Sequence, residues 1–122
     1  MLLVLGCSGP VEPTETPSPT PDEVARYIAA TERYTSYAAI GYVNDMYAAN
    51  ANSALCALQA IEPPRQLEAL HEQALRGYQH IYDGKVLLPG AGSELRAEAF
   101  FMIEWGIGLL LDYRQELDRM RS

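Results

Sequence analysis

Residues 99–111, AFFMIEWGIGLLL, form an apolar run in which Glu104 is the only charged side chain. The run lies inside a longer stretch without proline. Acidic side chains near the start of that stretch and basic ones near its end suit the dipole of a helix. We therefore predict a helix over residues 94–121, with Ser93 as its N-cap. This helix carries more large apolar side chains than one face of a surface helix normally does, so its packing is central to the fold.

The predicted core face of this helix follows three- to four-residue spacing and contains Leu95, Ala99, Met102, Gly106, Leu109, Tyr113, Leu117 and Met120. On the opposite side we expect Phe101 and Trp105, with Phe100 and Leu111 on a flank. Glu104 and the net charge count against contact with a membrane, and two other interpretations remain open. Another helix covers both sides, or these four residues form a protein–protein or self-association interface. In the second case Phe101 and Trp105 are the anchors, because aromatic side chains dominate interface energetics.

Proline and glycine mark the boundaries of the preceding helix. The sequence Glu62-Pro63-Pro64 ends one helix and starts the next. Residues 64–83 then show an amphipathic pattern, and Gly84 provides the predicted C-terminal stop. Residues 85–92 form the predicted loop. The apolar face of this helix consists of Leu67, Leu70, His71, Ala74, Tyr78, Ile81 and Tyr82.

The N-terminal folded segment begins with a capping box. Thr20 can cap the helix, Pro21 suits its first position, and Glu23 can bond back to the cap amide. No proline follows until Pro63, which allows one long helix, but the two halves carry apolar stripes on nearly opposite sides. Either this helix breaks near residues 41–45, or its halves face different neighbours. We therefore predict an all-α fold, an antiparallel three-helix bundle, or a four-helix bundle if the first helix breaks.

The N-terminal motif Val4-Leu5-Gly6-Cys7 resembles a bacterial lipobox. We interpret residues 1–7 as a truncated signal peptide that ends at a lipidated cysteine, Cys7. Residues 8–21 hold five prolines, and this composition predicts a flexible Pro/Thr/Ser linker. The predicted helical domain, residues 22–122, is then attached to the membrane through a lipid anchor. We expect it in the cell envelope, facing outside the cytoplasm.

A further resemblance covers about half of the chain. Ile61-Glu62-Pro63-Pro64 is followed by Leu67, Leu70-His71 and Tyr78, and the last helix carries Ala99 and Gly106. In these features the chain resembles small bacterial lipoproteins of unknown function with a C-terminal helical hairpin. The resemblance implies a secreted helical bundle, and it supplies no activity or catalytic residue to carry over.

The composition argues against several classes of function. The net charge is −7 and no basic cluster offsets it, so binding to nucleic acid is not expected. Cys7 and Cys56 lie far apart, and no paired Cys/His spacing is present, so we expect neither structural zinc nor any other cofactor. We expect Cys56 to be a small buried apolar residue. No nucleophile arrangement or phosphate-binding loop is present, so no catalytic residue is assigned.

One pattern points to a different function. Glu68-x-x-His71 places a carboxylate and an imidazole one turn apart, as in di-iron carboxylate bundles, and a symmetric dimer would supply the second motif. The other interpretation is that His71 is a neutral core residue with one hydrogen bond, while Glu68 lies off the apolar face and meets water. We expect His80 to be solvated on the polar face. Tyrosines of the first helix could line a ligand groove, although such rings more often pack inward: Tyr27, Tyr34, Tyr37, Tyr42 and Tyr47.

The sequence therefore favours a non-catalytic, lipid-anchored, extracytoplasmic helical bundle that acts as a binding or adaptor module of the cell envelope. Its expected partners are the membrane, through the anchor, and a protein or a second copy of the chain. The alternative is a dimeric, ferritin-like metal-binding protein that uses Glu68 and His71.

Overall fold

The computed structural model describes residues 19–121, and within this range the chain is all-α with no strand, which confirms the predicted fold class. The predicted lipobox with Cys7, and the linker up to residue 18, lie outside the described residues. In chain order the elements are α1 (Pro21–Thr35), α2 (Tyr37–Gly41), the 3-10 turn η1 (Val43–Asp45), α3 (Ala48–Gln59), the 3-10 turn η2 (Arg65–Leu67), α4 (Glu68–Leu87) and α5 (Ser93–Arg121).

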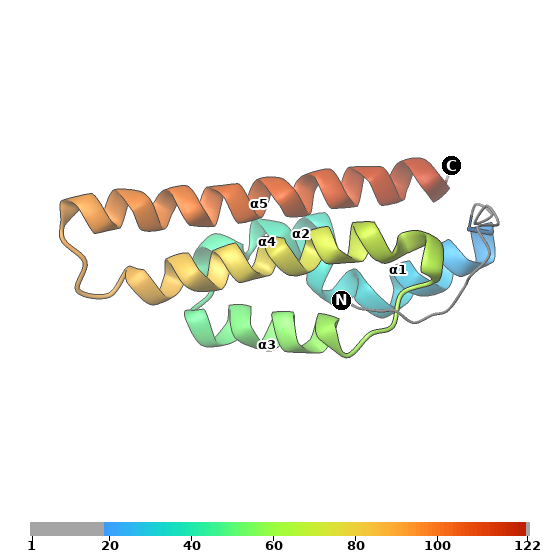
Figure 1. Ribbon diagram of the computed structural model, residues 1–122, viewed down its shortest axis with the longest axis horizontal. Coiled ribbons are helices and arrows are strands. Elements are labelled where there is room, and N and C mark those ends of the chain that lie inside the picture. The colour runs from blue at the N-terminus through green and yellow to red at the C-terminus, as the bar shows by residue number, and fades with distance from the viewer. Residues whose placement is uncertain (1–18, 122) are drawn as a thin grey trace, which may run out of the picture.

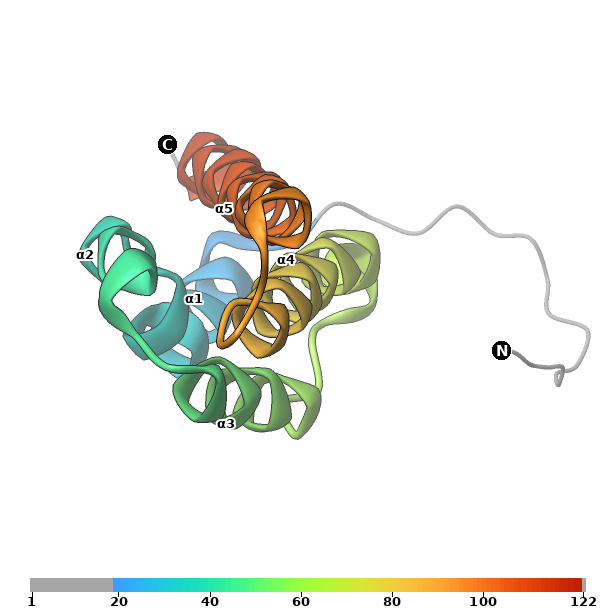
Figure 2. The same ribbon diagram turned by 90° about the vertical axis from the view of Figure 1, so that its left-hand side faces the viewer.

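The two longest helices form an antiparallel hairpin. Figure 1 shows α4 and α5 side by side, with the chain reversing direction in the loop between them. In the end-on view α4 lies in the middle, with α5 on one side and α3 on the other (Figure 2). Helix α1 packs against α5 and α3, while α2 packs against α5. The core therefore surrounds the inner faces of α4 and α5, where Tyr78, Ile81, Leu110 and Tyr113 are almost fully buried.

The N-terminal segment is not one continuous helix. Its start is the predicted capping box, in which the Glu23 amide donates to the Thr20 hydroxyl (3.1 Å) and the Thr20 amide donates to the Glu23 carboxylate (2.9 Å). A first break occurs at Ser36, whose extended backbone ends α1 and whose hydroxyl accepts from the Ala39 amide to cap α2. A second break lies between α2 and α3, in the region where the sequence left a break open. The breaks let each short helix turn its own apolar side toward the core.

A buried cation joins α2 to α5. Arg114 is 5% exposed, and its Nε lies 3.3 Å from the Asp118 carboxylate. The guanidinium also lies over the ring of Tyr37, 5.9 Å from its centroid, while the Tyr37 hydroxyl donates to Asp118 (3.1 Å). Because a buried charge is costly without a partner, these contacts hold α2 against the C-terminal half of α5.

Helix α4 continues past its predicted stop. The expected end at Asp83-Gly84 is wrong, since α4 extends to Leu87. Gly84 is instead a contact residue: a Cβ there would lie 2.6 Å from the Ala99 carbonyl oxygen and 2.7 Å from Ile103 Cγ1. The glycine that does turn the chain is Gly90, with φ of 76°.

The core face of α5 is rotated from the prediction. Ala99, Gly106, Tyr113 and Leu117 are buried as expected, but Leu95 and Met120 are exposed. Ile103 and Leu110 are buried in their place, and apart from Arg114 the buried positions alternate four- and three-residue steps: Ala99, Ile103, Gly106, Leu110, Tyr113 and Leu117. Gly106, which both faces share, lies directly against α4, where a Cβ would overlap the Gly77 carbonyl oxygen. The α4–α5 interface thus depends on small residues on both helices.

We expect Gly106→Ala to lower the free energy of unfolding by about 2 kcal/mol, because the added methyl group overpacks the interface. A Cβ at Gly106 would lie 2.7 Å from Ile81 Cγ1. Gly108 is the matched control, since a Cβ there has no neighbour within 4 Å. Gly108→Ala should raise stability by about 0.5–1 kcal/mol through helix propensity. Urea unfolding measures both, and equal effects of the two substitutions would contradict the close packing.

Candidate functional site

Aromatic side chains of α4 and α5 form an exposed surface, which we call the aromatic face: His80, Phe101 and Trp105. Phe101 is 62% exposed and Trp105 is 52% exposed. The Trp105 ring stacks on the imidazole of His80, with 4.7 Å between centroids and 13° between planes. Phe101 contacts Trp105 with 5.8 Å between centroids. The stack joins the two helices and holds the indole ring in place at the surface.

The four predicted interface residues differ in how far they are exposed. Phe101 and Trp105 lie on the aromatic face, and Phe100 is 47% exposed. Leu111 is partly buried and packs against the core, so it offers little surface to a partner. His80 was missed as a member of this surface, because the sequence predicts a simple solvated side chain there. The distance between His80 and Trp105 depends on how α4 packs on α5. A pattern within one segment of sequence carries no information about that packing.

Exposed acidic side chains of α5 lie near the aromatic face. By helical spacing, Glu98 and Glu104 each lie one turn from Phe101, and both are exposed. Asp112 is exposed two turns beyond Trp105 on the same helix. Apolar rings surrounded by solvated charges match the anatomy of a protein interface, with an apolar centre and a polar rim.

Polar side chains are also buried in the core. A series of hydrogen bonds connects them across four helices. The Tyr113 hydroxyl of α5 donates to the Tyr27 hydroxyl of α1 (2.9 Å). The Tyr27 hydroxyl lies 2.7 Å from His71 Nδ1 on α4, and His71 Nε2 lies 2.9 Å from the Leu58 carbonyl oxygen of α3. A carbonyl oxygen only accepts, so Nε2 carries the proton and Nδ1 accepts from Tyr27. We call this arrangement the Tyr–His line.

Burial keeps every member of the Tyr–His line in its neutral form. It lowers the pKa of His71 from its ordinary value of 6.5, and it raises the pKa values of Tyr27 and Tyr113. The unfolded chain therefore protonates His71 at a higher pH than the folded protein does. The contribution of His71 to stability is complete above about pH 6.5 and decreases as the pH falls below that value.

The geometry of His71 does not favour the metal-binding alternative. Nε2 carries a proton that it donates to Leu58, and the Nδ1 lone pair accepts from Tyr27, so neither nitrogen can bind an ion without breaking the Tyr–His line. Glu68 is exposed, and it shares with His71 only the lining of a surface cavity of about 440 Å³ beside Pro63. Within residues 19–121, no three His, Cys, Asp or Glu side chains converge as a metal site.

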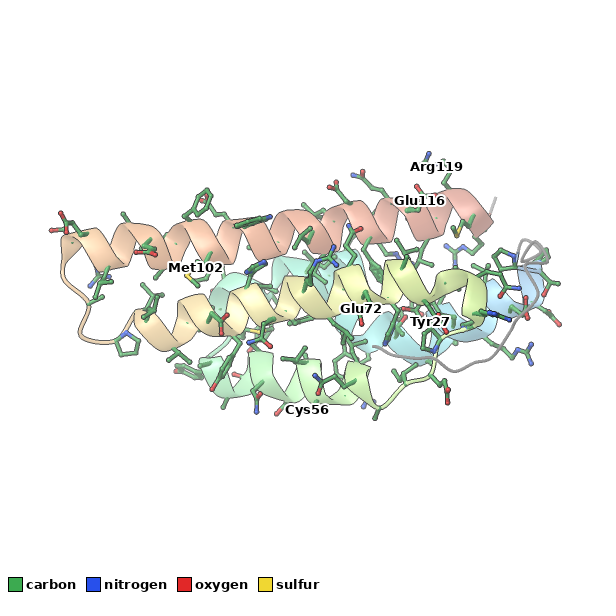
Figure 3. All side chains as sticks on the ribbon, in the orientation of Figure 1. Tyr27, Cys56, Glu72, Met102, Glu116 and Arg119 are labelled. Carbon is green, nitrogen blue, oxygen red and sulfur yellow. The ribbon has the colours of Figure 1, made fainter. Side chains whose placement is uncertain are left out.

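The prediction for Cys56 is wrong. Its side chain is exposed on the outer side of α3, away from the other helices (Figure 3). The buried positions of α3 are Ala51, Ala54, Leu55 and Leu58, so the apolar face passes beside Cys56 rather than through it. The residue type alone suggested that Cys56 is buried. Its burial depends instead on which face of α3 packs against the core, and Cys56 lies outside that face.

The chain was compared with models of protein families, with curated proteins and with solved structures, and none of them matches. In the part of the chain that the structure describes, no helix combines the length and apolar character needed to span a bilayer.

We expect Tyr27→Phe to lower the free energy of unfolding by about 2 kcal/mol, because it leaves His71 Nδ1 without its buried partner and removes one of the partners of the Tyr113 hydroxyl. Tyr113→Phe removes only the end of the line and should cost about 1 kcal/mol. Tyr47, which is 80% exposed, provides the control, and Tyr47→Phe should change stability by less than about 0.5 kcal/mol. Chemical denaturation ranks the three variants, and a smaller loss for Tyr27→Phe than for Tyr113→Phe would contradict the central place of Tyr27.

Proposed function

We propose that this antiparallel helical bundle is a non-catalytic, lipid-anchored module of the bacterial cell envelope that binds a protein partner through its aromatic face. The observation that carries the proposal is the exposure of Phe101 and Trp105 beside the stacked imidazole of His80. Tryptophan is among the residues most enriched at the energetic centres of interfaces.

The aromatic face can supply part of the free energy of binding to a partner. Burying the exposed parts of the Phe101 and Trp105 rings would remove on the order of 200 Å² of apolar surface from water. At roughly 25 cal/mol per Å², this is about 5 kcal/mol before the costs of association. The stack on His80 reduces those costs, because the Trp105 ring is already ordered before a partner arrives.

The proposed location follows from the N-terminal sequence. Cys7 follows a lipobox-like motif, and residues 8–21 are rich in proline. Such a linker, extended at about 3.1 Å per residue, would hold the domain some 40 Å from the membrane surface. The resemblance of residues 61–117 to small bacterial lipoproteins supports the same location. A module on such a linker can reach partners in the envelope while staying attached to the membrane.

Photo-crosslinking in native membranes tests the binding function. A photoreactive phenylalanine analogue replaces Phe101 in the full chain, and the control carries it at Gln115, which is exposed on the same helix. We expect one discrete adduct from position 101 and none from position 115, because only the first lies on the aromatic face. Adding Trp105→Glu should remove the adduct while circular dichroism still shows a folded helical protein.

Two results would contradict the proposal. The first is identical labelling from positions 101 and 115, since this means that the aromatic face has no special role. The second is loss of helical structure in Trp105→Glu, because the ring would then belong to the core. The same membranes test the anchor: Cys7→Ser should move the chain from the membrane fraction to the soluble fraction.

A further inference from the structure

A cavity of about 450 Å³ lies among α1, α2 and α3, which lie together in Figure 2, with Tyr78 of α4 also in its lining. It occurs where the chain breaks at Ser36 and turns between α2 and α3. Pockets for small molecules in proteins commonly enclose 300–1,000 Å³ and often lie between the helices of a bundle. The cavity is separate from the aromatic face, because its lining includes no residue of α5.

Tyrosine rings and small apolar groups line most of this cavity. Tyr34 is partly buried, Tyr42 is 56% exposed, and Tyr78 is buried. The Tyr78 hydroxyl donates to the Tyr34 carbonyl oxygen (2.6 Å), and burial raises the pKa of Tyr78 to about 12, so this donor persists at neutral pH. Tyr78 is only 1% exposed and its hydroxyl is engaged, so it forms the floor of the cavity, and the accessible ring surface comes from Tyr34 and Tyr42. Flat aromatic walls suit a planar aromatic ligand, which stacks on such rings.

The charge in this cavity is positive. Arg33 is the only charged residue in the lining, and within residues 19–121 it forms no ion pair. The chain as a whole has a net charge of −7, and the cavity beside Pro63 is lined by three glutamates and no lysine or arginine. A lone guanidinium at an otherwise uncharged cavity is suited to a carboxylate, which it can bind through two parallel hydrogen bonds.

Two further groups can donate hydrogen bonds to the same anion. The Asn50 side-chain oxygen accepts from the Tyr47 amide (2.8 Å), which leaves the Asn50 amide nitrogen as a donor. Ser53 is exposed in the same lining and adds a hydroxyl. The lining thus offers hydrogen-bond donors to a carboxylate, which only accepts.

We propose that this cavity binds a small aromatic carboxylate, with the ring against Tyr34 and Tyr42 and the carboxylate on Arg33. The site is independent of the aromatic face, so it adds a small-molecule ligand to a protein-binding module. Its position where α1, α2 and α3 meet means that an occupant would contact all three helices.

The test uses 2-naphthoate as the probe and the folded chain at low ionic strength, with two-dimensional amide NMR as the readout. We expect saturable shifts in residues around the cavity. Arg33→Gln should weaken binding about fivefold, the effect of an exposed ion pair, and Tyr42→Ala about tenfold through lost ring contact. Arg26→Gln is the matched control, since Arg26 is exposed on α1 and does not line this cavity.

The neutral analogue 2-naphthamide separates charge recognition from apolar binding. Wild-type protein should prefer the acid over the amide, and Arg33→Gln should remove that preference while Arg26→Gln keeps it. The proposal is overturned if 2-naphthoate does not saturate at millimolar concentration, or if its shifts lie around Trp105 rather than the cavity. Equal binding by the wild type and Arg33→Gln would also overturn it. Unchanged amide spectra of the unliganded variants establish that each is folded.

Discussion

The Tyr–His line is the constraint on which the arrangement of the helices depends. Tyr113, Tyr27, His71 and the Leu58 carbonyl belong to four different helices, and each bonds to the next through a buried hydrogen bond. A buried polar group without a partner costs more than a satisfied one contributes, so any alternative packing has to keep these atoms together. Only one distribution of protons satisfies the whole line. The line therefore selects one packing among the many that apolar helices allow.

Close packing of glycine works with this line to orient α5. Gly106 faces Gly77, and Gly84 faces Ala99, so the backbones of α4 and α5 approach closely along the hairpin. With those positions turned inward, Phe101 must lie on the outer side of the helix. Trp105 then stacks on His80 at the edge of the interface. The exposed aromatic side chains are thus a consequence of how the core is made, and the proposed function uses them.

The sequence correctly predicted the features that depend on residues adjacent in the chain. The all-α class and the capping box at Thr20 were correct, because caps depend on a few adjacent residues. The stop at Gly84 was wrong, since a glycine that ends a helix and one that allows close packing look alike in sequence. The rotation of α5 and the exposure of Cys56 were missed for a related reason: apolar periodicity defines a helix face only within about one residue. The break at Ser36 depends on a single hydroxyl, which sequence patterns signal weakly.

The candidate sites depend even more on tertiary contacts. The sequence did place His71 in an apolar face, which favours a neutral ring with a hydrogen bond, but its partners on α1 and α3 are distant along the chain. The pairing of His80 with Trp105 likewise needs the register of α4 on α5. The cavity at Arg33 lies beside two breaks in the N-terminal segment, and the sequence left open only the second, near residues 41–45.

The most direct test of this account is the protonation state of the His71 imidazole, measured from its ring nitrogen resonances by NMR and assigned with His71→Gln. The Tyr–His line predicts a neutral ring with the proton on Nε2 at neutral pH. It also predicts that the ring stays neutral below pH 6.5, the ordinary pKa of histidine, because burial lowers the pKa of His71. A proton on Nδ1 alone, or a charged ring at neutral pH, would show that the four helices are not joined by this line of hydrogen bonds.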